Sequence, residues 1–217
     1  MKSGGPLVTL GAVAALGIGI LFVNVSREPE AAPAGEPVAQ SATTTAAPAP
    51  PPSTRASAPF PAKADYVGEI PIKTGVITLE ITVDGDKAIA YACDGNTVEV
   101  WLSGSADDGV VNLANKDKTS RLNGRHEGNT VVGTLWIGDR KWDFTTAAVQ
   151  PPAGLYAYEE GGVRSSWIID ANGSVTGVQR RADGATSPAP RLSTDGTAVI
   201  DDRTVTAFRV GGDSDVF

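Results

Sequence analysis

The chain has 217 residues and a formal net charge of −7, which allows one domain of usual size with accessory segments. Its basic residues occur singly or in pairs and form no stripe along the sequence, so we do not expect it to bind nucleic acid. The acidic balance also argues against charge-driven binding to anionic lipid head groups.

The first predicted element is a membrane-spanning helix over Leu7 to Val25. The segment carries no charge, and at ~1.5 Å per residue its length is close to the ~30 Å of a bilayer core. Lys2 precedes it, whereas Glu28 and Glu30 follow it. This bias favours a cytoplasmic N-terminus of residues 1–6, with the rest of the chain outside the plasma membrane. The first expected partner is therefore the lipid bilayer.

A cleaved signal peptide is the alternative interpretation of this segment. The small residues Ala31 to Ala34 offer an A-x-A-like cleavage site, and cleavage there would give a secreted protein. The apolar run is longer than the ~7–15 residues of a usual signal core. We therefore prefer an uncleaved anchor, and keep secretion as the alternative.

Residues 26–62 are predicted to form a disordered linker. Nine of the fifteen prolines lie between residues 28 and 62, and Val38 and Phe60 are almost the only large apolar residues there. Such a segment cannot bury enough surface to fold, and its proline clusters favour extended polyproline II. Its Ser and Thr clusters resemble O-glycosylated stalks, although an unmodified spacer is the preferred interpretation.

Residues 63–217 are predicted to form an all-β domain. Short β-rich runs alternate with turn pairs such as Asp84-Gly85, Asp94-Gly95 and Asn172-Gly173, which favour tight hairpins. We expect about twelve strands in an antiparallel meander that forms a barrel or a sandwich. Pro151-Pro152 is the only plausible seam, and we prefer one compact unit across it.

Two sequence features inside this domain are interpreted as irregular structure. Asn123-Gly124 is taken as a turn between strands, because this pair favours positive φ. Ala182 to Arg191 is taken as a loop, because it contains several turn-forming residues.

The sequence contains one histidine and one cysteine. His126 lies beside predicted turn residues, so we expect an exposed, solvated imidazole. The sequence also lacks a G-x-S-x-G motif, which would supply a nucleophilic serine for His126 to activate. Cys93 is predicted to be a small buried apolar residue in a strand. No ligand spacing joins the two into a zinc site. We therefore assign no catalytic residue, no metal ligand and no cofactor.

Three acidic motifs bear on possible chemistry. Asp170 to Ser174 resembles the start of a calcium loop, but Val175 and Arg181 stand where such a loop needs glycine and glutamate. A hairpin turn is therefore expected there. Glu159-Glu160 and Asp201-Asp202 are adjacent pairs, and neighbouring strand residues point to opposite faces. Neither pair is expected to act as a dyad.

The four tryptophans all lie in predicted strands, at positions 101, 136, 142 and 167. They could line a ligand pocket or a carbohydrate platform. Core packing is the simpler interpretation, because large aromatic side chains dominate the burial of small β domains.

Four short motifs carry a resemblance to a known group of proteins: Ala90 to Gly95, Trp101 to Gly104, Gly154 to Tyr156 and Trp167 to Ile169. Together with the Pro/Ala-rich stalk, this pattern resembles membrane-anchored or secreted cell-envelope proteins of actinobacteria, over roughly Tyr66 to Gln179. The resemblance implies a location in the envelope and implies no activity.

These observations lead to three functional hypotheses. The first is a non-enzymatic interaction or ligand-binding module on the outer face of the plasma membrane, with an envelope protein or a wall component as its partner. The second is an envelope enzyme that acts on cell-wall glycan through carboxylates from separate strands. The third is a closed β-barrel that carries an apolar ligand.

Overall fold

The computed structural model describes residues 57–212 and residue 214. The expected cytoplasmic segment 1–6, the expected membrane helix 7–25 and most of the linker 26–62 lie outside the described residues. Within the described part of the chain, no helix has the length and apolar character needed to cross a bilayer.

The described residues form fifteen strands. Their bounds are β1 Lys63–Ile72, β2 Gly75–Asp84, β3 Lys87–Cys93, β4 Glu99–Asp107, β5 Val110–Ala114, β6 Ser120–Glu127, β7 Thr130–Ile137, β8 Arg140–Val149, β9 Gly154–Glu160, β10 Val163–Ile169, β11 Val175–Arg180, β12 Thr186–Pro188, β13 Thr197–Ile200, β14 Arg203–Thr206 and β15 Phe208–Arg209. The predicted all-β class is confirmed.

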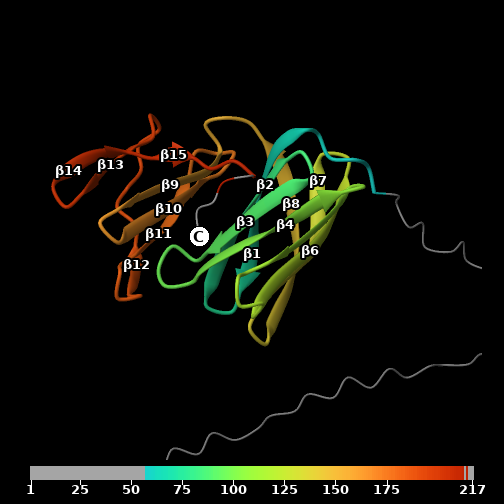
Figure 1. Cartoon of the computed structure of the whole chain (residues 1–217), viewed down its shortest axis with the longest axis horizontal. Helices are drawn as coiled ribbons and strands as arrows, with labels where there is room; N and C mark the ends of the chain where they lie inside the picture. Colours follow the sequence, from blue (N-terminus) through green and yellow to red (C-terminus); the bar gives the residue numbers. More distant parts are fainter. Residues whose placement is uncertain (1–56, 213, 215–217) are drawn as a thin grey trace, which may run out of the picture. The chain divides into compact units, whose positions relative to one another are not determined.

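Strands β1 to β8 form a closed antiparallel barrel (Figure 1). Each strand pairs with the next one along the chain, and β8 returns to pair with β1 through Tyr66↔Ala148 and its neighbours. The predicted meander is therefore confirmed, and of the two closures that we considered it is the barrel that forms.

Side chains fill the interior of this barrel. Alternate residues of every strand point inward, and Leu79, Leu122 and Leu135 are fully buried at its centre. An eight-stranded barrel has an interior just wide enough for its own side chains. The period-2 alternation in the sequence therefore corresponds to a packed core.

One barrel strand, β6, was missed by the sequence analysis, which interpreted Asn123-Gly124 as a turn. Gly124 lies in the middle of β6 and points into the barrel. A Cβ at this position would approach Val131 Cγ1 at 3.0 Å, Val111 Cγ1 at 3.1 Å and the Phe144 ring at 3.2 Å. Glycine is needed here because the interior is crowded, whereas we had interpreted it as a residue that permits a turn.

A second sheet follows the barrel directly after Pro151-Pro152. Its strand order is β12-β11-β10-β9-β15, and β13 and β14 form a separate hairpin. The described residues thus contain more strands than the expected twelve. One of them, β12, lies within Ala182 to Arg191, where we expected only a loop, because Thr186 to Pro188 pair with Val178 to Arg180.

The second sheet packs on the outer face of the barrel. An apolar cluster joins the two, and it comprises Val67, Ile89, Tyr91, Cys93, Trp101 and Val149 of the barrel with Ala153, Leu155, Ala157, Ile168, Val178 and Val210. Strands β2 and β3 are therefore buried on both faces over most of their length. The other face of the second sheet packs on the hairpin through Trp167, Ile169 and Ile200.

Candidate functional site

A groove lies on the outer face of β3 and β4, where the barrel meets the second sheet. It consists of two adjoining cavities of about 580 and 550 Å³, which share Trp101, Asn115 and Lys116 in their linings. The first cavity extends to Arg164 of β10 and Arg180 of β11, and the second to Lys87 and to the segment near Gly212. We call the two cavities together the cationic groove.

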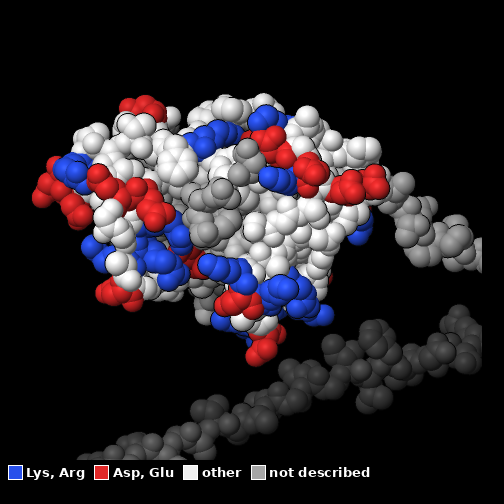
Figure 2. Space-filling model, viewed as in Figure 1, with Lys and Arg blue, Asp and Glu red and all other residues white. Residues whose placement is uncertain are grey.

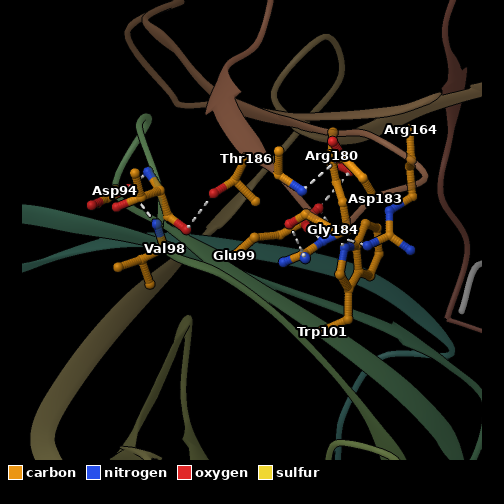
Figure 3. A network of polar contacts seen from close by, with 12 residues as sticks. Asp94, Val98, Glu99, Trp101, Arg164, Arg180, Asp183, Gly184 and Thr186 are labelled. Carbon is orange, nitrogen blue, oxygen red and sulfur yellow. Dashed lines mark hydrogen bonds and ion pairs between the residues drawn. The ribbon is translucent and has the colours of Figure 1, made fainter.

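A buried carboxylate anchors one end of the groove. The Glu99 side chain is 1 % exposed. Its Oε2 accepts hydrogen bonds from Arg180 Nε at 2.5 Å and from Arg164 Nη2 at 3.2 Å, and its Oε1 accepts one from Trp101 Nε1 at 3.2 Å. A carboxylate removed from water needs such partners. Figure 3 shows both guanidinium groups close to Glu99.

The Glu99 contacts connect the barrel to the second sheet. Glu99 belongs to β4, whereas its two arginine partners belong to β10 and β11. A third link lies beside them, because Thr186 Oγ1 donates to the carbonyl of Thr97 at 3.2 Å (Figure 3). The position of both arginines over the groove therefore depends on how the sheet docks on the barrel.

Trp101 forms the floor between the two cavities. The ring centroids of Tyr91 and Trp101 lie 4.6 Å apart, and the Arg164 guanidinium carbon lies 5.6 Å from the Trp101 centroid. The tryptophan is 8 % exposed. It therefore supplies an apolar edge to the groove, and little of its ring face remains open for a ligand.

The turn between β5 and β6 places two lysines at the groove. Asn115 Oδ1 accepts a hydrogen bond from the amide of Ser120 at 2.8 Å. Asp117 Oδ1 accepts hydrogen bonds from the amide and the hydroxyl of Thr119. These bonds hold the polar side chains of the turn against its own backbone and leave Lys116 and Lys118 at the cavity walls. The Thr119 hydrogen bonds lower the pKa of Asp117.

Lys118 has a backbone conformation that is unusual for its residue type. Its φ is +59°, in the left-handed region that costs a side chain of this kind roughly 1–2 kcal/mol relative to glycine. Other turns of the barrel place glycine at such positions, as at Gly85 and Gly138. A lysine thus occupies a strained position on the wall of a cavity.

The charge of the groove is opposite to that of the chain. Its described lining contains five cationic residues, Lys87, Lys116, Lys118, Arg164 and Arg180, and two acidic ones, Glu99 and Asp117. The lining therefore has a formal charge of +3 on a chain of −7. Lys and Arg gather over β11 and β12 and on the adjacent end of the barrel (Figure 2).

The structure corrects the expectation of an exposed His126. The residue is 4 % exposed and points into the end of the barrel. Its Nδ1 donates to the carbonyls of Ala58 and Pro59 at 3.0 and 2.9 Å, and Phe60 stacks on its ring with centroids 4.9 Å apart. His126 is buried because residues 57–62, placed in the linker by the sequence analysis, cover this end of the barrel.

Cys93 is buried in β3, as predicted. Burial raises the pKa of its thiol to about 12, so the reactive thiolate is not formed near neutral pH. Among the tryptophans, Trp101 and Trp167 lie in the core, whereas Trp136 and Trp142 are half-buried. Because Trp142 packs against the barrel core, core packing explains three of the four, and Trp101 also reaches the groove.

The acidic motifs form turns and surface pairs. Asp170 Oδ1 accepts the amides of Asn172 and Ser174, which confirms the predicted hairpin turn. Glu160 pairs with Arg203 and accepts the Tyr158 hydroxyl at 2.6 Å. Asp201-Asp202, which we treated as strand residues, instead form the β13–β14 turn with positive φ. In the described residues, no group of three or more His, Cys, Asp or Glu side chains is placed to hold a metal ion.

Two carboxyl groups that the sequence analysis did not single out do come together. Glu80 is fully buried beneath the second sheet, and the Thr82 hydroxyl lies 2.6 Å from Glu80 Oε1 and 2.9 Å from Asp65 Oδ1. Arg209 Nη2 donates to Asp65 at 2.9 Å. Burial, and then the neighbouring Asp65, raise the pKa of Glu80 well above its usual value.

This carboxyl pair lies beside a small cavity of about 190 Å³, which Asp65, Thr82 and Arg209 help to line. Glu80 is not part of its lining. Only one of the two carboxyl groups can therefore reach a molecule bound there.

Another cavity, of about 770 Å³, lies beside β11 and the segment from Pro188 to Thr194. Arg191 is the one charged residue among the described residues that line it. The indole N–H of Trp167 is occupied, because it donates to the carbonyl of Pro190 at 2.8 Å. This cavity offers fewer groups for recognition than the cationic groove.

Comparisons with family models, with curated proteins and with solved structures find no match to this chain. The geometry of the groove and the sequence of the N-terminal segment are therefore the basis for assigning a function.

Proposed function

We propose that the chain is a membrane-anchored binding module of the cell envelope, held by Leu7 to Val25 and displayed outside the cytoplasm. Its binding site is the cationic groove, and its ligand is an anionic component of the envelope. The proposed role is recognition, without catalysis.

The observation that carries this proposal is the sign of the groove. The lining has a formal charge of +3, whereas the whole chain has −7, so cationic residues are concentrated in the groove although the chain as a whole is acidic. Lys87, Lys116 and Lys118 form no ion pair within the described residues. A concave site lined by one sign of charge concentrates ligands of the opposite sign.

Carriage of an apolar ligand inside the barrel receives less support. Leucine, isoleucine, valine and phenylalanine side chains occupy the barrel interior. Binding of a partner through an apolar face also receives less support. The exposed large hydrophobic residues among those described, Val76, Val110, Val199 and Phe208, come from four separate strands. Recognition sites of that kind need a contiguous patch.

The location is tested by a reporter fused after Phe217 and by fractionation of the cells that express it. We expect the reporter to be active only outside the cytoplasm and the chain to remain in the membrane fraction. A reporter that is active only in the cytoplasm would exclude an envelope function.

Ligand binding is tested by capture from a cell-envelope extract on the immobilised full chain. We expect retained material that elutes with salt, because screening weakens attraction between exposed charges. The variant Lys116→Glu, Lys118→Glu should retain much less of it. Equal retention by the parent chain and this variant would show that binding occurs elsewhere.

A further inference from the structure

We infer that the ligand of the groove is a strand of anionic glycan that presents at least two carboxylate or phosphate groups. This inference rests on the proposed function, because it names the chemical class of the anionic component.

The groove is longer than one anionic group needs. Its two cavities join at Trp101 and Lys116, and each has its own cations. Arg164 and Arg180 lie at one end, where they share the single carboxylate of Glu99, and Lys87 and Lys118 line the other. A small monoanion would contact one end only. A ligand with repeated charges can engage both ends at once and gain affinity through the linkage between them.

A peptide strand fits the groove poorly. The floor consists of β3 and β4, which are inner strands of a closed barrel, each paired with two neighbours. Their backbone groups are occupied, so an extended peptide would find no free edge to pair with. A glycan needs no such edge, because its hydroxyl groups can bond to side chains and water.

Nucleic acid and lipid surfaces fit the groove less well than a glycan. Single-stranded nucleic acid binds by stacking its bases on aromatic rings, whereas Tyr91 and Arg164 already occupy the surroundings of Trp101. A bilayer surface is flat, and the groove is concave. The net charge of the chain would also oppose an anionic membrane.

The lining between the cations is polar at its exposed position Ser103, which carries a hydroxyl group. Ala88 and Ile89 also border the cavity, but each is 1 % exposed and belongs to a buried apolar cluster. The hydroxyl groups of a sugar chain can bond to such a polar lining directly or through water.

The test uses the full chain in mild detergent and measures binding by titration. The carboxylate probe is oligogalacturonate from one to several residues, and the phosphate probe is an oligosaccharide whose sugars are joined by phosphodiesters. Polyglutamate, single-stranded DNA and phosphatidylglycerol vesicles represent the competing classes. We expect one or both of the glycan-type probes to bind more tightly than these three. Affinity should rise with length by at least about tenfold between one and several charges, because a longer ligand reaches both ends of the groove.

Groove variants identify where the probe binds. Lys116→Glu should weaken binding at least about tenfold, because a like charge opposes the ligand. The matched control is Lys73→Glu, which makes the same charge change in the exposed β1–β2 turn outside the groove lining. It should leave the affinity within about twofold of the parent, because salt screens the charge at position 73 from the anionic probe in the groove.

Two outcomes would overturn the inference. Tighter binding of polyglutamate, DNA or lipid than of either glycan-type probe would assign the groove to another class and leave the proposed function standing. Glycan binding that Lys116→Glu and Lys73→Glu weaken equally would show a charge effect with no site at the groove. Failure of the full chain to retain any envelope component would contradict the proposed function itself.

Discussion

The barrel and the second sheet solve the problem of burying a β-sheet in different ways. The barrel closes on itself, leaves no strand edge unpaired and fills its own interior. The second sheet is open, ends in β12 and β15 of three and two residues, and buries its inner face on the barrel. The sheet thus depends on the barrel for its core, whereas the barrel encloses a core of its own.

The cationic groove lies where these two regions meet, and each contributes part of it. The barrel supplies Glu99, Trp101 and three lysines, and the sheet supplies Arg164 and Arg180. A rigid barrel wall thus carries one half of the site, while the other half depends on docking. The comparison predicts that damage to the barrel affects the whole domain, and that damage at the junction affects the groove first.

The largest effect is expected from Leu135→Ala in the barrel core. Leu135 is fully buried, and its truncation should cost about 2–5 kcal/mol because it removes apolar contacts and leaves a cavity. Urea denaturation should show a lower midpoint for the whole domain. Ile200→Ala in the β13–β14 hairpin is the comparison variant. Hydrogen exchange should there increase mainly in the hairpin, and equal loss of barrel protection would contradict the different dependence of the two regions.

A smaller effect is expected from Arg180→Ala at the junction. Glu99 would keep Arg164 but lose its closest partner, which should cost about 1.5–3 kcal/mol, the range for hydrogen bonds to charged groups. In the Glu99→Gln background the same change should cost less, because residue 99 is then neutral and no buried charge loses its partner. Thermal unfolding of the four proteins of this cycle measures the coupling. Additive effects would show that the pair does not hold the sheet to the barrel.

A pH-dependent effect is expected from Glu80→Gln beneath the sheet. Burial and Asp65 raise the pKa of Glu80 well above its usual 4.5, so between pH 4.5 and that raised pKa the folded protein holds a proton that the unfolded chain has released. Stability should therefore fall as the pH rises above 4.5 toward the folded pKa. Glutamine needs no proton, so the variant should gain stability relative to the parent chain at pH 8 and lose this advantage near pH 4. An equal change at both pH values would contradict a protonated Glu80.

The smallest effect on stability is expected from Lys118→Gly in the β5–β6 turn. Glycine relieves the positive φ of this position, so the variant should gain about 0.5–1 kcal/mol despite the flexibility that glycine adds to the unfolded chain. It should also bind anionic ligands more weakly, because one groove cation is lost. A variant with unchanged affinity would remove Lys118 from the site.

Local patterns in the sequence were enough to predict the β class and the meander. Alternating runs and hairpin turns are properties of neighbouring residues, and the turns at Gly85 and Gly173 follow from them. The strand β6 was missed for the opposite reason. The glycine at position 124 is required by Val111, Val131 and Phe144, which are distant in sequence, and no local pattern distinguishes it from a turn glycine.

The groove could not be predicted for a similar reason. Its five cations lie between Lys87 and Arg180, far apart in the chain, and each is isolated or beside an acid or another base in the sequence. Only the docking of β10 and β11 beside β4 brings them together. Among the groove residues, Lys116, Asp117 and Lys118 are consecutive in the sequence, where the aspartate formally offsets one of the lysines. The structure shows that the Asp117 carboxylate bonds to its own turn, which the sequence does not reveal.

The most direct test of the account is a titration of the full chain with a defined anionic glycan, performed beside the variant Lys116→Glu, Lys118→Glu and the control Lys73→Glu. The account predicts salt-sensitive binding by the parent chain and the control, with a loss of at least about tenfold in the double variant. Equal affinity of all three proteins for the glycan, or no glycan binding by the parent chain, would contradict an anionic glycan as the ligand of the cationic groove.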